Sequence, residues 1–207
     1  MTSIFRPDLI AHRHQLFAVP QPLYYEPAKF AQYWPFVSNI WEQSKAHPRK
    51  ANGSSQRTNC ACRCHHDAKR DRTVAGGAGI RNRGYNELDC NAAIAIIREY
   101  RSGDDTEPWR IRIERVKGKE DQSHSHTLDY VDERSSSIGL KDAVQGLFAV
   151  TTKPNDILEL MREGPDSQAF AEAGARFMDY QRVKYCNVKA VRSKSNIRQS
   201  DAASTTT

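Results

Sequence analysis

The chain has 207 residues, enough for one ordinary domain or for a compact module with appended helices, since domains typically run to about 100–150 residues. Its 38% hydrophobic and 27% charged residues allow a modest core with solvated ends and exclude a large multidomain enzyme. The net charge of +6 is concentrated, because ten basic and two acidic residues lie between positions 45 and 83, which favours a polyanionic partner.

Hydropathy and cysteine content indicate the compartment. No apolar run approaches the ~20 residues that span a bilayer, and residues 1–16 lack the apolar centre of a signal peptide. We therefore expect an intracellular protein that does not associate with membranes. Five cysteines, an odd number, then favour metal ligation or free thiols over a disulfide framework.

Residues 1–26 contain prolines and an aromatic pair without clear periodicity, which predicts an irregular N-terminal arm. From Phe30 to Trp41 the apolar residues recur at helical spacing, which predicts an amphipathic helix. Pro35 should kink this helix or lie in its first turn, because proline lacks a backbone N–H.

Residues 58–64 alternate cysteine with other residues. If this segment is a strand, its period of two places Cys60, Cys62 and Cys64 on one face. Glycines and arginines follow, and residues 65–87 are predicted to form a disordered basic loop.

Two further stretches, residues 90–97 and 109–116, predict a β-hairpin with a turn around Gly103. The second stretch alternates apolar with charged residues, so that Arg110 and Arg112 lie on one solvated face. A short polar stretch then leads to the pair His124 and His126.

The C-terminal third changes to helical spacing. Apolar positions predict helices around residues 140–148, 157–161 and 169–183, the first of them capped by the run Ser135–Ser137. We assign residues 135–192 to a helical linker and residues 193–207 to a disordered polar tail. The predicted fold is α+β, with a small antiparallel sheet in a module of residues 27–134 and helices beside it.

Cysteines and the His-x-His pair predict one metal site. On an extended segment His124 and His126 point to the same side, so both can reach one ion. With two thiolates they complete a closed tetrahedral site, which suits one structural Zn²⁺ and leaves no open position for catalysis. Cys90 is one thiolate ligand. The other is Cys60, Cys62 or Cys64; we favour Cys64 because it is nearest the strand end, with Cys62 as the alternate.

This order of motifs resembles the WRKY and glial-cells-missing type of zinc finger. It is most similar to the N-terminal DNA-binding domain of Mutator-like transposases and of far-red-impaired-response proteins. Cys90-Asn91-Ala92 and His124-Ser125-His126-Thr127-Leu128 carry the resemblance, which covers about residues 30–130. Thr127 departs from the family, where proline is common. The resemblance implies a DNA-binding module, and the chain ends where the catalytic domain of a transposase would begin.

We therefore expect a nuclear protein that binds double-stranded DNA, as a transcription regulator or a transposase-derived fragment. The residues expected to contact bases or phosphates are Arg98, Arg101, Arg110 and Arg112. Those expected to contact the DNA backbone nonspecifically are Arg57, Arg63, Lys69, Arg70 and Arg72.

Other functions were weighed from the same residues. A zinc-stabilised module could instead bind a protein partner through its helical third. A thiol-rich enzyme or metal-handling protein is a third possibility, and His12-x-His14 could be a second metal pair. No Cys-x-x-Cys, nucleophile elbow, phosphate-binding glycine loop or His-Glu-x-x-His occurs, so we expect no catalytic site.

Overall fold

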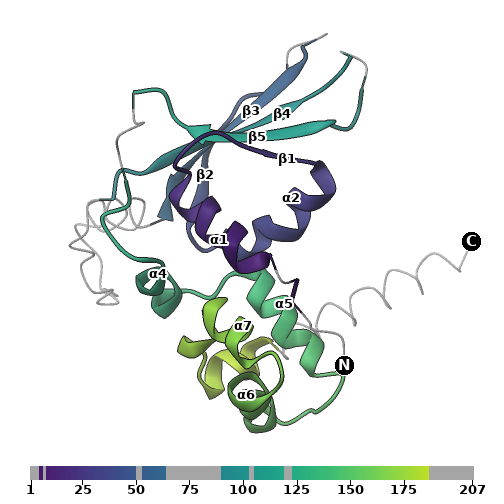
Figure 1. The fold of residues 1–207 in the computed structure, drawn as a ribbon, viewed down its shortest axis with the longest axis vertical. Helices are drawn as coiled ribbons and strands as arrows, with labels where there is room; N and C mark the ends of the chain where they lie inside the picture. Colours follow the sequence, from purple (N-terminus) through teal and green to yellow (C-terminus); the bar gives the residue numbers. More distant parts are fainter. Residues whose placement is uncertain are drawn as a thin grey trace, which may run out of the picture.

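The computed structural model describes residues 5–6, 8–49, 53–63, 90–102, 105–118 and 123–186. A five-stranded antiparallel sheet lies at one end of the molecule and helices lie below it (Figure 1), which confirms the α+β prediction. The strands are β1 (Leu23–Tyr25), β2 (Trp41–Ala46), β3 (Ser55–Cys62), β4 (Ala93–Glu99) and β5 (Arg110–Arg115), in the spatial order β1-β5-β4-β3-β2. None of the described helices is long and apolar enough to cross a membrane.

The helical segments fall into two groups along the chain. The first comprises α1 (Leu9–Ala18), α2 (Pro27–Tyr33) and the 3₁₀ turn η1 (Trp34–Val37). The second comprises α4 (Leu128–Arg134), α5 (Ile138–Leu147), α6 (Pro154–Glu163), α7 (Ser167–Glu172) and the 3₁₀ turn η2 (Ala175–Phe177), followed by helical residues 180–186.

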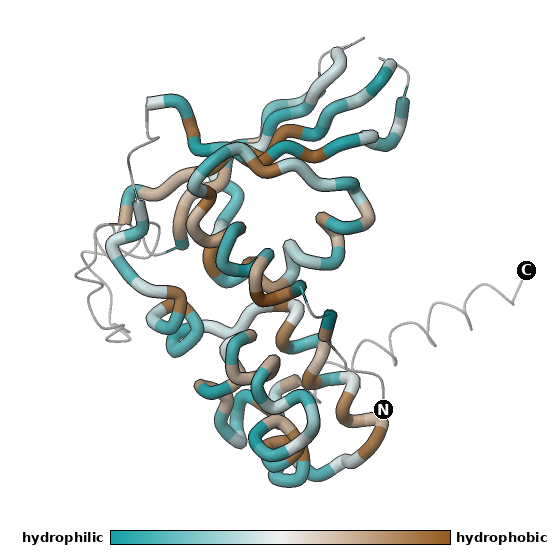
Figure 2. Tube along the Cα trace, in the orientation of Figure 1, coloured by the Kyte–Doolittle hydropathy of each residue, from teal (hydrophilic) through white to brown (hydrophobic). Residues whose placement is uncertain are grey.

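Strand register gives the sheet two different faces. Ile96 lies opposite Ile113 on the inner face, where both are at most 3% exposed. Arg112 lies opposite Ile97 on the outer face, because residues directly opposite one another in an antiparallel pair share a face. The β4–β5 hairpin predicted from the alternation is therefore confirmed. Figure 2 shows hydrophobic segments on the central strands and on the helices below them, where the core lies.

The N-terminal segment departs from its prediction. Within residues 1–26 we predicted an irregular arm, but the described part forms α1 and β1. The apolar pattern of α1 is weak because its buried side includes a charged residue, Arg13, which is only 1% exposed. Its partner Asp132 is far away in sequence, so no local periodicity reveals it.

The helix predicted from Phe30 to Trp41 is also shorter than expected. Pro27 occupies its first turn, α2 ends at Tyr33, and Pro35 lies in the 3₁₀ turn that follows. Trp41 then begins β2, where it pairs with Cys62 of β3. The proline therefore breaks the helix, since the backbone N–H needed to continue it is missing.

In the C-terminal third the predicted cap and the first two helices are confirmed. The N–H of Leu140 donates to Ser137 Oγ at 3.2 Å and caps α5. The third predicted helix is divided, because Gly174 has a φ of +95° between α7 and η2. A Cβ at Gly174 would lie 2.6 Å from Asp132 Cγ, so glycine both permits the turn and leaves space for Asp132.

A buried ion pair joins these helices. Arg13 Nη2 donates to Asp132 Oδ1, and both side chains are at most 3% exposed. Arg13 Nη1 also donates to the Glu172 carbonyl at 2.8 Å, and Asn39 Nδ2 donates to Asp132 Oδ1 at 3.0 Å. Burial raises the pKa of Asp132, and Arg13 opposes that rise. The pair thereby connects α1 with α4 and the end of α7.

We expect Arg13→Ala to lower the free energy of unfolding by about 3–5 kcal/mol, because it leaves the Asp132 carboxylate buried without its counter-ion. Urea denaturation followed by circular dichroism measures this. Arg6→Ala is the control: Arg6 is 54% exposed and lies 3.8 Å from the Asp8 carboxylate, so its loss should cost about 0–1 kcal/mol. Equal effects of the two substitutions would contradict a structural role for the buried pair.

Candidate metal centre

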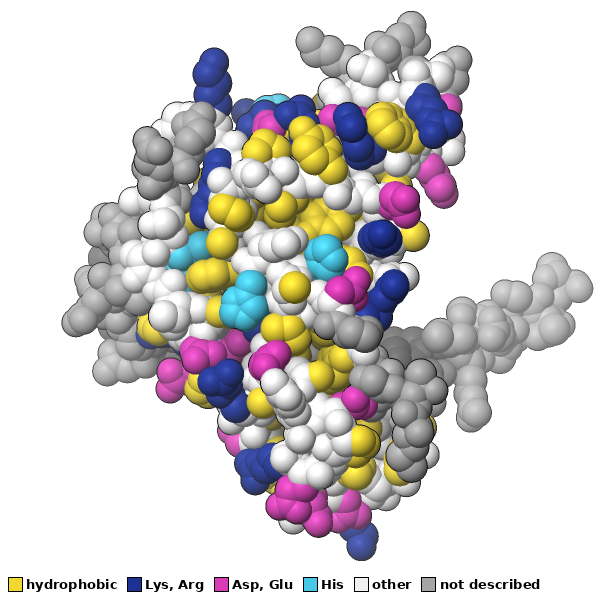
Figure 3. Space-filling view, viewed as in Figure 1, with side chains coloured by type: hydrophobic (Ala, Val, Ile, Leu, Met, Phe, Trp, Pro, Cys, Tyr) yellow, Lys and Arg dark blue, Asp and Glu magenta, His cyan; other side chains and the backbone are white. Residues whose placement is uncertain are grey.

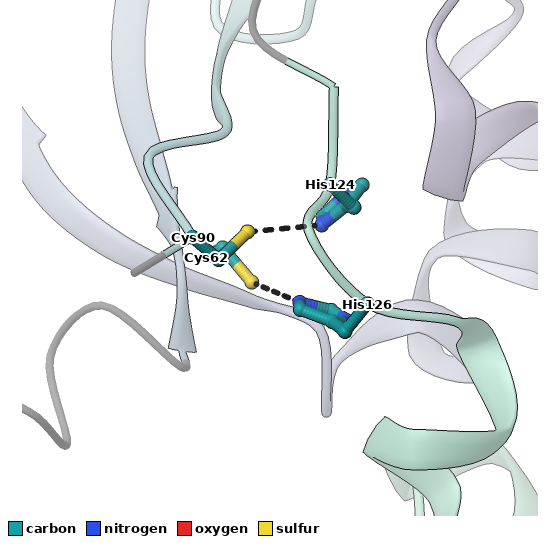
Figure 4. A group of neighbouring side chains, drawn as sticks. All are labelled: Cys62, Cys90, His124 and His126. Atoms are coloured by element: carbon teal, nitrogen blue, oxygen red, sulfur yellow. Dashed lines mark hydrogen bonds between the residues drawn. The ribbon is translucent and has the colours of Figure 1, made fainter. Parts of the chain in front are cut away.

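Four potential ligands gather at one end of the sheet: Cys62, Cys90, His124 and His126 (Figure 4). Their donor atoms all lie within 4.8 Å of one another. The two cysteines are buried and the two histidines are partly buried. These four side chains can therefore surround one metal ion.

Strand pairing explains how the two cysteines meet. Cys62 is the last residue of β3, and its N–H donates to the Ala92 carbonyl at 2.9 Å. This bond extends the pairing of β3 with β4 and brings Cys90, just before β4, beside the end of β3. The histidines lie on the short irregular segment of residues 123–126, which leads into α4, and Thr127 is the N-cap of that helix.

Each histidine presents one ring nitrogen to a thiol. Cys62 Sγ lies 3.3 Å from His126 Nε2, and Cys90 Sγ lies 3.4 Å from His124 Nδ1. The other nitrogen of each ring faces a backbone oxygen: His124 Nε2 lies 3.0 Å from the Phe17 carbonyl, and His126 Nδ1 lies 3.1 Å from the Thr127 carbonyl. Because a carbonyl only accepts, hydrogens on these outer nitrogens would leave the inner nitrogens with lone pairs for a metal ion. Such outer contacts orient imidazoles for metal binding.

The environment also favours a thiolate at Cys90. Its pKa is well below the usual range, chiefly because of hydrogen bonding with Cys62 and further with His124 and His126, which outweighs the opposing effect of burial. Cys60 differs, since burial raises its pKa to about 11. Cys60 lies in the core and is outside the four-residue group. A thiolate is the form that binds metal, so the lowered pKa of Cys90 agrees with its place in the group, whereas Cys60 is excluded by its position.

Three predicted ligands, Cys90, His124 and His126, are thus brought together. The position of the first ligand is taken by Cys62, which the strand pattern gave as the alternate. Cys64, the residue favoured from sequence, lies outside the described residues. Cys60 shares the inner face with Cys62, but it lies two residues further from the end of β3.

Aromatic residues around the histidines were not found from sequence. Phe17, near the end of α1, stacks on His124 with ring centroids 4.0 Å apart and an interplanar angle of 10°. Trp41 lies 5.0 Å from His124, and Tyr130 lies 5.4 Å from His126. The contribution of Phe17 could not be predicted while residues 1–26 were taken as irregular.

His12 and His14 do not form a second ligand pair in the described structure. They lie on α1, where residues two apart point in different directions. His12 Nδ1 lies 3.2 Å from the Tyr25 hydroxyl, and its ring stacks on Tyr33. Neither histidine belongs to a group of three or more possible ligands among the described residues.

The arginines of the hairpin are extensively paired. Arg110 Nη2 lies 2.6 Å from Glu99 Oε2, and Arg112 contacts both Glu99 and Glu114. Arg57 lies 3.6 Å from Glu114 on the same outer face. Three arginines therefore share two carboxylates, so this face is less positive than its arginine content suggests.

The remaining predicted DNA-contacting residues are scattered. Arg98 projects from the inner face, opposite to Arg110 and Arg112, and its Nη1 donates to Thr58 Oγ1 at 3.3 Å. Arg101 and Arg63 are exposed beyond the ends of β4 and β3. The basic loop predicted at residues 65–87, with Lys69, Arg70 and Arg72, lies outside the described residues.

Comparison with known proteins gives no relative: no family model, curated protein or solved structure matches the chain. The zinc-finger resemblance noted in the sequence therefore depends on the residues of this chain alone. Function has to be argued from the metal centre and the surfaces around it.

We expect the protein to bind one Co²⁺ per chain with the strong visible absorbance of a tetrahedral thiolate site. Cys90→Ser and His126→Ala should each remove a ligand and abolish or shift that spectrum. Cys60→Ser is the matched control, because it removes a buried thiol outside the group and should leave the spectrum unchanged. Two metal equivalents, or equal losses in Cys60→Ser and Cys90→Ser, would contradict this assignment.

Proposed function

We propose that the four ligands hold one structural Zn²⁺. Zn²⁺ bonds sulfur at about 2.3 Å and imidazole nitrogen at about 2.1 Å, so tetrahedral angles would separate the two donors by about 3.6 Å. The observed separations of 3.3 and 3.4 Å are close to that value. Two thiolates and two imidazoles suit borderline-soft Zn²⁺, and four protein ligands fill its coordination sphere. The ion would thus contribute to folding rather than to catalysis.

We infer that the module binds double-stranded DNA, and one observation carries this inference. Strand β2 lies at an edge of the sheet, with β3 as its only strand neighbour among the described residues. Its side chains Gln43, Ser44 and Lys45 are exposed. The major groove of B-form DNA admits a two-stranded ribbon, and a polar edge strand can reach base edges there.

The metal centre supports the base of this ribbon. Cys62 lies opposite Trp41 where β2 begins, and Trp41 Nε1 donates to the buried Leu16 carbonyl at 2.9 Å. A register shift then places Gln43 and Lys45 on opposite faces of the edge. The ribbon is therefore anchored at one end and presents a donor or acceptor on each side.

Charge favours the same assignment. The segment that begins at Lys45 is the most basic part of the sequence, with ten basic and two acidic residues up to position 83. Exposed cations attract the DNA backbone and release its counterions. The outer-face arginines Arg110 and Arg112 already pair with glutamates. We therefore assign the main contacts with the DNA duplex to the ribbon formed by β2 and β3. In a cell such a protein would act in the nucleus, as a transcription regulator or a transposase-derived DNA-binding fragment.

We expect affinity for duplex DNA to fall as salt rises, and Lys45→Ala to weaken binding roughly 3- to 10-fold. Removing one phosphate contact should also lower the slope of log affinity against log salt by about 1. Fluorescence anisotropy with a random-sequence duplex measures both. Lys153→Ala is the control, since Lys153 is an exposed lysine before α6 in the helical third.

Absence of duplex binding at low salt, or an affinity that salt does not change, would overturn the DNA-binding proposal. The zinc-stabilised protein-interaction module would then be favoured. Its surface would be sought on the helical third, where Ile138 and Val150 are 54% and 76% exposed.

A further inference from the structure

Two aromatic side chains are exposed at the edge of the sheet opposite to β2. Tyr24 of β1 is 56% exposed, and Trp109, just before β5, is 41% exposed. The other large hydrophobic side chains that are exposed among the described residues belong to the helical third. Neighbouring exposed rings form an apolar patch, and such patches mark interaction sites more often than single exposed side chains do.

Guanidinium groups lie between and beside these rings. Arg110 Cζ lies 5.0 Å from the Tyr24 ring centroid and 4.5 Å from that of Trp109. Arg101 Cζ lies over Trp109 at 5.6 Å. Figure 3 shows hydrophobic and basic side chains next to one another along the upper rim of the molecule, over the sheet. We refer to Tyr24, Trp109, Arg101 and Arg110 as the aromatic–arginine platform.

The platform is held in position by the sheet. Tyr24 lies opposite Arg112 in the pairing of β1 with β5. The Trp109 N–H donates to the Glu99 carbonyl at 2.9 Å, and Arg110 Nε donates to Glu99 Oε2 at 2.7 Å. The planar groups are thus oriented before any partner arrives, which reduces the entropy lost on binding.

We propose that the aromatic–arginine platform binds single-stranded nucleic acid by stacking unpaired bases on Tyr24 and Trp109. Aromatic rings stack any base through its flat face, and arginine adds cation–π contact and a charge for the phosphates. In a duplex those base faces are covered by neighbouring base pairs, so an unpaired strand is the form of nucleic acid that fits.

Charge argues against a cationic or neutral partner. Arg101 is exposed, and no carboxylate among the described residues pairs with it. Arg110 and Arg112 are paired with the carboxylates of Glu99 and Glu114, so the excess positive charge at the platform comes from Arg101. The platform therefore combines stacking surfaces with a local excess of positive charge, as single-strand-binding surfaces do.

The platform is also separate from the proposed duplex surface. It lies at the β1 edge of the sheet and the ribbon lies at the β2 edge, with β5, β4 and β3 between them. The two sites also lie at opposite ends of β4. Arg110 of the platform pairs with Glu99 at the C-terminal end of β4, whereas the metal ligand Cys90 lies just before its N-terminal end. This inference accordingly does not depend on duplex binding.

Binding of fluorescently labelled oligothymidine, measured by anisotropy on the full chain, tests the proposal. We expect Trp109→Ala and Tyr24→Ala each to weaken binding roughly 5- to 150-fold, since stacking on one aromatic side chain contributes that much. Trp109→Phe keeps a stacking ring and should retain most of the affinity. Tyr185→Ala is the matched control, because Tyr185 is 56% exposed like Tyr24 but lies in the helical third.

Tryptophan fluorescence gives an independent readout. Trp41 is only 3% exposed and Trp34 is partly buried, so quenching by bound bases should come mainly from Trp109. The quenching should disappear in Trp109→Phe while anisotropy still reports binding. Circular dichroism of each variant confirms that the fold is kept.

Several outcomes would overturn the proposal. They are an absence of oligothymidine binding at low salt, an unchanged affinity in Trp109→Ala, and equally tight binding of polyglutamate, which offers charge without bases. Lys45→Ala should weaken duplex binding but leave oligothymidine binding intact. If only the duplex fails to bind, the proposed function is wrong and the platform stands; if only oligothymidine fails, the reverse holds.

Discussion

The convergence of Cys62, Cys90, His124 and His126 is the constraint on which the sheet end of the molecule depends. It joins the end of β3, the residues just before β4, and the segment between the β4–β5 hairpin and α4. Apolar side chains such as Trp41, Ala92 and Leu128 pack around these segments, and the four ligands add a polar connection between them. The imidazoles are oriented by the carbonyls of Phe17 and Thr127. A site prepared in this way would lose little entropy on binding an ion, and an ion held by all four residues would connect the strands to the segment that leads into α4.

Helix α1 links this centre to the rest of the protein. Its last turn contributes the Phe17 ring and carbonyl to His124, while Arg13, one turn earlier, pairs with Asp132 in α4. One short helix therefore contacts both the metal centre and the helical third. A buried ion pair is a costly way to join two elements, because both charges lose their water. Arg13 also donates hydrogen bonds to the carbonyls of Phe36 and Glu172. These bonds offset part of the desolvation cost and fix the orientation of α1.

The parts that could be predicted from sequence were those controlled by local chemistry. The His-x-His spacing and Cys90 pointed to three of the four candidate ligands, because few residue types bind soft metals and two histidines so close in sequence can reach one ion. The period of two in a strand could not choose among Cys60, Cys62 and Cys64, since it puts all three on one face. That choice depends on where β3 ends against β4. Helix α1 was missed for a related reason: its buried arginine is stabilised by a partner more than 100 residues away, which no periodicity can show.

Arginine content alone does not show where positive charge is available to a partner. Arg110 and Arg112 share a face as the alternation predicted, yet Glu99 and Glu114 neutralise much of their charge, and Arg98 projects from the opposite face. Pairing also changes what an arginine can do. An arginine held by a carboxylate is less free to bind a phosphate group. Its guanidinium plane is held in a fixed orientation, as that of Arg110 is between the Tyr24 and Trp109 rings. The outer face is therefore better suited to flat partners than to a duplex backbone, whereas Gln43, Ser44 and Lys45 of the edge strand β2 are exposed. The metal centre lies at the base of that edge and away from the platform. If an ion is held there as proposed, its removal should impair the β2 edge first and leave the contacts at the far end of the hairpin more nearly intact.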